Sequence, residues 1–220
     1  MLGDFVFISD FDGTITKKDF YWHIIDMYLE KEGNDKYKKW QRGEMKDIDF
    51  LSYIFKNIGQ DEEQIYKDII KMKIDPYLKD FIDFIHSKNG DFIVLSAGTR
   101  YYIDILFEHL SLQDITVYSN KAVYKDKGIH FDIDPTDKFY SERYGIDKKK
   151  VVKYLKSKYN KTFYAGDSMP DYEPSLLCDE RFATNKLISI FKEKGVNFHS
   201  FNSFKDIEYI LKKRELKDEI

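Results

Sequence analysis

Short apolar runs rich in β-branched and aromatic residues recur along this chain of 220 residues, and helical patterns separate most of them. Strands that alternate with helices favour a largely parallel sheet, joined by right-handed crossovers and covered by helices on both faces. The sequence therefore predicts an α/β fold built on a doubly wound parallel sheet. Residues 116–124 and 128–133 also predict an antiparallel hairpin. The runs that we interpret as strands of the sheet are Phe5–Ser9, Phe92–Ser96, Ile115–Tyr118, Thr162–Ala165, Arg181–Ala183 and Phe198–Phe201.

A long helical segment interrupts this alternation soon after the first strand. Between Asp19 and about Met72 the apolar residues follow helical spacing, and no strand-like run occurs among them. Because such a stretch is too long for a simple crossover, we interpret it as a small helical domain inserted into the sheet domain. The prediction is a core of residues 1–16 and 75–220 with a helical cap of residues 17–74. A domain inserted at a strand end is suited to act as a lid that excludes water and contacts the substrate.

Composition narrows the class of function. Charged residues make up 34% of the chain, but both signs are mixed and the net charge is −3, whereas a nucleic-acid groove requires clustered Lys and Arg. No apolar run approaches the ~18 residues of a membrane span, and the first residues lack the pattern of a signal peptide. The single cysteine, Cys178, fits a reducing compartment, and we expect it to fill a core position. We therefore expect a soluble, cytoplasmic monomer or homodimer that acts on a small molecule and binds neither nucleic acid nor a membrane.

Two aspartates follow the first predicted strand. Asp10 and Asp12 stand at its carboxyl end in the segment Asp10-Phe11-Asp12-Gly13-Thr14, and open α/β sheets bind their ligands at that edge. Asp10 is placed to attack a phosphorus atom as a nucleophile, and Asp12, two residues on, to serve as general acid and base. By itself the pair is equally compatible with a turn rich in Asx hydrogen bonds. A calcium loop is disfavoured, because the later glycine and glutamate of an EF-hand are missing.

A second acidic loop follows a later predicted strand. Gly166-Asp167-Ser168-Met169-Pro170-Asp171 comes directly after Thr162–Ala165. Carboxylates from separate strand ends supply the hard oxygen ligands that Mg²⁺ prefers, so Asp10 and Asp167 indicate a magnesium site. A bound cation would also offset the repulsion between clustered carboxylates. Asp171 either orients Asp167, or binds the metal through water, or complements the dipole of the following helix.

Two further positions are suited to phosphate binding. Ser96 ends the second predicted strand, and its hydroxyl and the following amides of Ala97 and Gly98 can bind phosphate oxygens at the start of a helix. Alternatively, Ser96 is only the N-cap of that helix, a common role of serine. Of the three lysines at 148–150, Lys148 is the candidate cation, because the apolar periodicity of a helix continues from it. A run of charges is usually a solvated face, so at most one of the three is expected to enter the site.

Together these four segments resemble the motifs of the haloacid dehalogenase superfamily of phosphatases. The resemblance covers the whole chain, with Asp10–Thr14, Ser96, Lys148 and Gly166–Asp171 in the order of the four motifs. It implies a Rossmann-like core with an inserted cap, and a magnesium-dependent phosphomonoesterase that forms an aspartyl-phosphate. It also implies the site residues: Asp10 as phosphoryl acceptor and Asp12 as general acid and base; Ser96 and Lys148 as phosphate ligands; and Asp10, the carbonyl of Asp12 and Asp167 as metal ligands supported by Asp171.

The position of the helical segment indicates the branch of the superfamily. An insertion straight after the first motif resembles the cap of the phosphoserine-phosphatase branch, and within it the chain is most similar to methionine-salvage phosphatases acting on 2-hydroxy-3-keto-5-methylthiopentenyl-1-phosphate. Asp19, the candidate specificity residue, stands where phosphoserine phosphatases carry a glutamate, and residues 48–58 lack the arginine expected to hold the serine carboxylate. The alternatives are a phosphoserine phosphatase or another metabolite phosphatase of the branch, a phosphotransferase, and a non-catalytic protein that senses a phosphate ligand.

Overall fold

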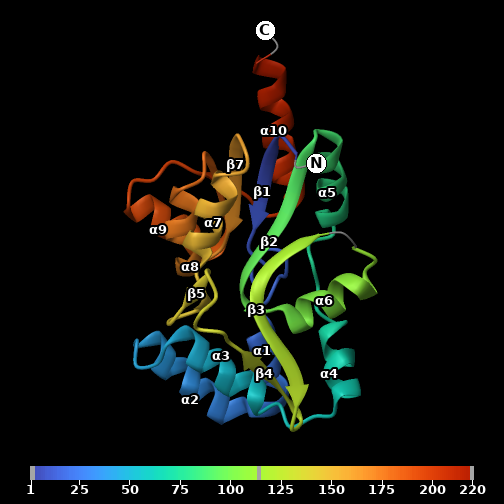
Figure 1. Cartoon of the computed structure of the whole chain (residues 1–220), viewed down its shortest axis with the longest axis vertical. Coiled ribbons are helices and arrows are strands. Elements are labelled where there is room, and N and C mark those ends of the chain that lie inside the picture. Colours follow the sequence, from blue (N-terminus) through green and yellow to red (C-terminus); the bar gives the residue numbers. More distant parts are fainter. Residues whose placement is uncertain (1–2, 113–114, 219–220) are drawn as a thin grey trace. The chain divides into compact units, whose positions relative to one another are not determined.

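The computed structural model (Figure 1) describes residues 3–112 and 115–218. Its main sheet has seven strands in the order β4-β3-β2-β1-β7-β8-β9. None of the helices in these two stretches is both long and apolar enough to cross a membrane. The strands are β1 (Phe5–Ser9), β2 (Gly90–Thr99), β3 (Thr116–Lys125), β4 (Gly128–Asp132), β7 (Lys161–Gly166), β8 (Glu180–Ala183) and β9 (His199–Ser200), with β5 (Tyr140–Ser141) and β6 (Gly145–Ile146) in a separate pair. The helices are α1 (Phe20–Ile24), α2 (Glu30–Gln41), α3 (Asp47–Lys56), α4 (Glu62–Ile69), α5 (Leu78–Ser87), α6 (Arg100–His109), α7 (Lys148–Lys156), α8 (Met169–Leu176), α9 (Asn185–Glu193) and α10 (Phe204–Asp218), and a π-helical turn at Ile25–Leu29 joins α1 to α2.

The chain divides into two compact units that share β2. Unit 1 comprises Met1–Lys17, Ile74–Leu95 and Lys148–Ile220, and unit 2 comprises Lys18–Lys73 and Ser96–Asp147. The helical segment thus belongs to the same unit as residues 96–147. The division into a core of residues 1–16 and 75–220 and a cap of residues 17–74 stays a prediction.

The strands of unit 1 pair in parallel around β1. β1 pairs with β2 on one side and with β7 on the other, and the pairing continues through β8 to β9. Figure 1 shows β1 between β2 and β7. Because both faces of such a strand are covered, its sequence is nearly continuous in apolar residues, and Val6–Ser9 are buried. The predicted α/β fold with a mostly parallel sheet is confirmed.

A layer of phenylalanine rings joins these strands to α5 and α10. The ring of Phe7 in β1 lies 5.9 Å from that of Phe92 in β2 and 4.8 Å from that of Phe81 in α5, measured between centroids. Phe81 in turn lies 5.2 Å from Phe204 in α10. Phe7, Phe81 and Phe204 are fully buried, and edge-on or offset ring contacts add to the free energy of burying them. The layer anchors β1, and with it the strand end that leads into Asp10.

The single cysteine lies in the interior of unit 1, as expected. Cys178 follows α8 and is 2% exposed. Burial raises the pKa of its thiol to about 12. Because the thiolate is the reactive form of cysteine, this side chain acts as a small apolar residue.

Unit 2 contains the helical segment, α6 and the β3–β4 hairpin. β3 and β4 pair antiparallel, and the turn residues Asp126 and Lys127 both have positive φ, as a two-residue type I′ turn requires. The predicted hairpin is confirmed. Helices α1, α3 and α6 meet through the buried rings of Phe20, Phe55 and Tyr102.

We expect Phe81→Ala to lower the free energy of unfolding by about 3–5 kcal/mol, because it removes a fully buried ring and leaves a cavity among three others. Urea-induced unfolding followed by circular dichroism measures the loss. Tyr209→Ala on α10 is the control, since that side chain is 65% exposed, and it should change the midpoint little. Equal midpoints for the two variants would contradict the role of the ring layer.

Candidate active site

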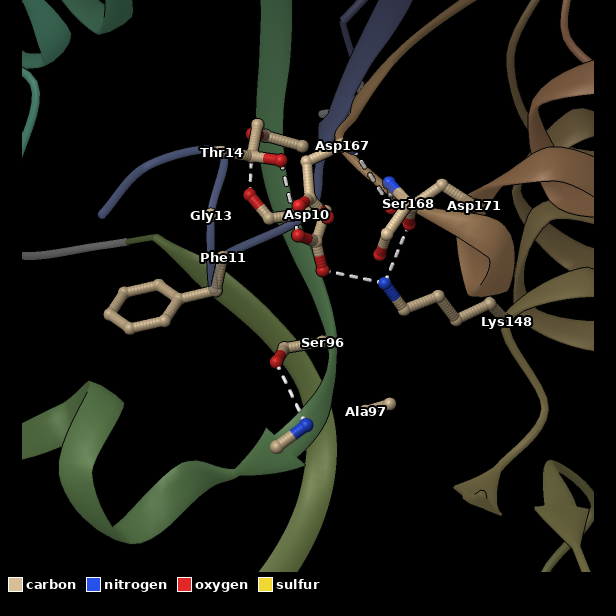
Figure 2. A network of polar contacts seen from close by, with 12 residues as sticks. Asp10, Phe11, Gly13, Thr14, Ser96, Ala97, Lys148, Asp167, Ser168 and Asp171 are labelled. Carbon is tan, nitrogen blue, oxygen red and sulfur yellow. Dashed lines mark hydrogen bonds and ion pairs between the residues drawn. The ribbon is translucent and has the colours of Figure 1, made fainter. Parts of the chain in front are cut away.

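Asp10 lies directly after β1, and its backbone and side chain are both held in place. Its amide donates a hydrogen bond to the carbonyl of Ala165 in β7 at 2.9 Å. The Thr14 hydroxyl donates to Oδ2 of Asp10 at 3.1 Å, and Nζ of Lys148 donates to Oδ1 at 2.6 Å (Figure 2). The residue is 5% exposed. Contacts from both sides thus fix the orientation of this carboxylate.

The turn after Asp10 is closed by the backbone. The carbonyl of Phe11 accepts hydrogen bonds from the amides of the three residues 14–16. Gly13 has a φ of 80°, which glycine adopts without strain, and its carbonyl accepts a hydrogen bond of 2.9 Å from the side chain of Asn185 at the start of α9. Asp12 lies half-buried in this turn. The turn brings the Thr14 hydroxyl back to the Asp10 carboxylate.

The second acidic loop connects β7 to α8 and folds around Asp171. Oδ2 of Asp171 accepts hydrogen bonds from the amides of Asp167 at 3.1 Å and Ser168 at 3.2 Å. A Cβ atom on Gly166 would lie 2.5 Å from Cβ of Asp171, so only glycine allows this approach. Asp171 is 1% exposed. It therefore shapes the loop that carries Asp167.

Lys148 is the lysine of the 148–150 run that reaches the acidic cluster. Its Nζ lies 2.6 Å from Oδ1 of Asp10 and 2.7 Å from Oδ1 of Asp171, and the side chain is 6% exposed. Lys149 instead pairs with Glu173 at the surface, at 2.8 Å. Oδ1 of Asp171 also accepts a hydrogen bond of 2.8 Å from the hydroxyl of the buried Tyr164. The result is a buried network of one ammonium, two carboxylates and one phenol.

The charges of this network shift the proton affinities of its members. Burial raises the pKa of Asp10 well above its ordinary value, and the carboxylates of Asp171 and Asp167 raise it further, while Lys148 lowers it. Burial alone would lower the pKa of Lys148, but Asp10 and Asp171 raise it by more, so the ammonium stays charged. Burial and the same two carboxylates raise the pKa of Tyr164. Tyr164 therefore keeps the proton that it donates to Asp171.

Carboxylate oxygens of Asp10, Asp167 and Asp171 converge closely enough to hold a metal ion. One oxygen of each lies within 4.8 Å of the others. This all-oxygen donor set fits a hard cation such as Mg²⁺, and a cation would relieve the repulsion that raises the pKa of Asp10. Asp171 differs from the other two, because its oxygens already accept four hydrogen bonds. That occupancy favours an orienting role for Asp171.

Ser96, Ala97 and Gly98 belong to unit 2 and lie in the last part of β2. Ser96 is 1% exposed, and its hydroxyl oxygen accepts a hydrogen bond of 3.0 Å from the Gly98 amide. The predicted N-cap role of Ser96 is wrong: β2 stays extended as far as Thr99, and the hydroxyl of Thr99 caps α6 by accepting from the Tyr101 amide at 3.2 Å. The amides after Ser96 are therefore offered by an extended strand end and not by a helix N-terminus.

Asp19 also belongs to unit 2. It is half-buried in the position that directly precedes α1, and its carbonyl accepts a hydrogen bond of 3.1 Å from the amide of Trp22. The backbone thus places this side chain at the start of the helical segment. Its role in substrate choice stays a prediction.

Comparison with known proteins identifies the family. The sequence model of a family described as "Putative Phosphatase" matches residues 5–186, most of the chain. The chain belongs to this phosphatase family. It is a phosphoric monoester hydrolase of the haloacid dehalogenase type, as the motifs predicted.

Individual relatives of this phosphatase match over nearly its whole length. The 2-hydroxy-3-keto-5-methylthiopentenyl-1-phosphate phosphatase of Exiguobacterium sibiricum is 25% identical, covering 91% of this chain and 93% of the relative. A polyol phosphate phosphatase of Saccharomyces cerevisiae is 26% identical, covering 92% and 90%. A crystal structure titled as a phospho-aspartyl intermediate analogue of phosphoserine phosphatase has a TM-score of 0.69 at 18% identity, over 97% of this chain and 99% of that one. At that identity the structure supports the fold alone.

Tyr164 is a residue of this network that the sequence patterns did not predict. In β7 it looks like one more apolar strand residue, between Phe163 and Ala165. The period of two places it on the same face of the strand as Gly166, which is the one local signal that it is near the acidic loop. Its partner Asp171 could not be read from that signal, because a hydroxyl has several possible partners at a strand end.

We expect Asp10→Asn to be more stable than the wild-type protein when a chelator is present at neutral pH. Because the pKa of Asp10 is raised in the folded protein, its protonated carboxyl stabilises the fold at a pH below the ordinary carboxyl pKa. This stabilisation is lost as the pH rises through the folded-state pKa. Asparagine does not ionise, so the variant avoids this loss of stability at neutral pH, while Lys148 keeps its pairing with Asp171. We expect a rise of about 2–4 °C in Tm, the shift that ~1 kcal/mol produces in a chain of this size.

Thermal unfolding with EDTA and with MgCl₂ measures this difference. Mg²⁺ should stabilise the wild-type protein more than the variant, because binding to the folded state alone raises stability by mass action. A variant that is less stable than wild type in EDTA, or that gains equally from Mg²⁺, would contradict the argument.

We expect Tyr164→Phe to lower kcat several-fold and stability by about 1.5–3 kcal/mol, because it removes a hydrogen bond to a buried carboxylate. Tyr159→Phe is the matched control: its hydroxyl donates to Asp91 at 2.6 Å, at the opposite end of the strands. The control should lose stability and keep kcat. Steady-state kinetics on a generic aryl phosphate measures kcat for both variants. An unchanged kcat in Tyr164→Phe would show that the network does not need the phenol.

Proposed function

We propose that this phosphatase hydrolyses a small phosphorylated metabolite through an aspartyl-phosphate formed on Asp10. The observation that carries the proposal is the Asp10 carboxylate, held by Thr14 and Lys148 at the end of β1 (Figure 2). In the first step a carboxylate oxygen of Asp10 bonds to phosphorus while the bond from phosphorus to the ester oxygen breaks. Asp12 donates its proton to this departing ester oxygen. In the second, Asp12 accepts a proton from the water that attacks phosphorus, and phosphate leaves Asp10 as a free carboxylate.

Mg²⁺ is the cofactor that we propose. Its protein ligands would be a carboxylate oxygen of Asp10, the carbonyl of Asp12 and a carboxylate oxygen of Asp167. When bound, it supplies positive charge that stabilises the transferring phosphoryl group. We assign Asp171 to orienting Lys148 and the Asp167 loop, because both of its oxygens already accept two hydrogen bonds each.

We propose Lys148, with Ser96 and the amides of Ala97 and Gly98, as the phosphate ligands. An ammonium has three N–H donors, and Lys148 directs two of them to Asp10 and Asp171. Among the hydrogen bonds of the described residues, the third donor is left for a phosphate oxygen. The buried charge of Lys148 also lowers the repulsion between Asp10 and an anionic substrate.

For the substrate, we propose 2-hydroxy-3-keto-5-methylthiopentenyl-1-phosphate first, and therefore a role in methionine salvage in the cytoplasm. The support is the relative of that name, which matches nearly the whole chain. Polyol phosphates come second, on the similar match to the yeast protein, and phosphoserine third. Asp19 is our candidate for the residue that discriminates among them.

The test is release of inorganic phosphate from these three substrate classes and from p-nitrophenyl phosphate, with MgCl₂ or with EDTA. We expect magnesium-dependent release from at least one of them and a loss of more than about 10³-fold in kcat for Asp10→Asn, since the nucleophile is gone. Asp83→Asn, an exposed acid on α5, is the matched control and should keep full activity. Normal turnover by Asp10→Asn would refute the aspartyl-phosphate, and silence on all substrates with tight phosphate binding would favour a sensing protein.

A further inference from the structure

A buried asparagine of β3 holds the strand end that contains Ser96. Nδ2 of Asn120 donates hydrogen bonds to the carbonyl of Ala97 at 2.9 Å and to the carbonyl of Tyr144 at 2.8 Å. Asn120 is 5% exposed. The preceding residue, Ser119, donates to the carbonyl of Gly98 at 3.0 Å. Two consecutive side chains of β3 therefore bind two consecutive carbonyls of the segment that we propose to bind phosphate.

The hydrogen bond to the Ala97 carbonyl also determines where the next amide points. In a trans peptide the C=O and N–H bonds lie in one plane and point in opposite directions. The carbonyl of Ala97 and the amide of Gly98 belong to the same peptide, so Asn120 directs the Gly98 N–H away from itself. That amide donates to Oγ of Ser96 at 3.0 Å. Asn120 thus sets the relative position of two groups that we assign to phosphate.

The surroundings of Asn120 are shaped for an amide of this size. Gly145, next to the bound carbonyl of Tyr144, has a φ of 77°, and a Cβ atom there would lie 2.3 Å from Oδ1 of Asn120. A residue with a side chain at 145 would be strained and would displace the asparagine. A buried polar side chain is costly unless its hydrogen bonds are made. Both donors of Asn120 are used, and one of them is used on the Ser96 segment.

We propose that Asn120 is a positioning residue for phosphate binding, which holds the Ala97–Gly98 peptide in the orientation that presents the Gly98 amide and the Ser96 hydroxyl together. The inference rests on the proposed function, because Ser96 and Gly98 are phosphate ligands only under that proposal. Asn120 itself acts through the peptide and does not contact the substrate.

The experiment compares Asn120→Ala with wild type by kinetics on p-nitrophenyl phosphate at saturating MgCl₂, with inorganic phosphate as competitive inhibitor. We expect the inhibition constant of phosphate and KM each to rise about tenfold, equivalent to ~1.4 kcal/mol, with a smaller fall in kcat. Asn120→Ser keeps one shorter donor, should show an intermediate rise, and gives the same comparison if the alanine variant does not fold. Ser119→Ala, which removes only the bond to the Gly98 carbonyl, is a milder perturbation of the same strand end.

A purely structural role would lower Tm and leave phosphate affinity unchanged, and that result in the folded variants overturns the inference. Tyr159→Phe is the control for loss of one side-chain hydrogen bond far from the strand end, and its phosphate inhibition constant should equal that of wild type. The double variant Ser96→Ala/Asn120→Ala adds a second criterion. If Asn120 acts through the Ser96 segment, the two effects on the phosphate inhibition constant are less than additive, whereas full additivity contradicts it.

The same measurements separate this inference from the proposed function. A wild-type protein without magnesium-dependent turnover, or a Ser96→Ala variant with unchanged phosphate inhibition, defeats the proposed phosphate site itself. An active wild type in which Ser96→Ala weakens phosphate inhibition and Asn120→Ala does not defeats only the role of Asn120.

Discussion

The geometry of the acidic cluster depends on one buried ammonium, that of Lys148. Removing a charge from water costs several kcal/mol unless partners compensate for it, and Lys148 finds two carboxylates within 2.7 Å. Asp10 and Asp171 in turn depend on the ammonium of Lys148, because without it they would be buried together as two like charges. The pairing joins the end of β1 to α7 and α8. A single group therefore reduces the net negative charge of the cluster and ties together three elements of unit 1.

The backbone decides which acids can meet this lysine. β1 and β7 pair in register, with Ser9 beside Ala165, so the residues that follow them leave the sheet at neighbouring points. Asp10 comes directly after one strand and Asp167 directly after the other. Their carboxylates approach each other because strand pairing brings the two chain segments together, and the ring of Phe7 in β1 also stacks on that of Phe163 in β7, 6.2 Å away between centroids. Packing on one face of the sheet is in this way coupled to chemistry at its edge.

Much of this architecture could be predicted from local patterns, and the failures have a physical reason. Apolar runs revealed the strands of unit 1, and helical periodicity singled out Lys148 from its neighbours. The N-cap interpretation of Ser96 failed because serine and threonine both cap helices, and the local signal does not say that the chain stays extended to Thr99. Tyr164 and Asn120 were not predicted because their partners lie elsewhere in the sequence, and only tertiary structure brings a donor to a particular carboxylate or carbonyl.

The burial of Cys178 has a consequence for how this phosphatase responds to oxidants. A thiol whose pKa is raised to about 12 is ionised in on the order of one molecule in 10⁵ at pH 7, and peroxides attack the thiolate. The nucleophile proposed for catalysis is a carboxylate, which such oxidants do not modify. With its side chain withdrawn from solvent, the single cysteine of this phosphatase presents oxidants with almost no reactive thiolate.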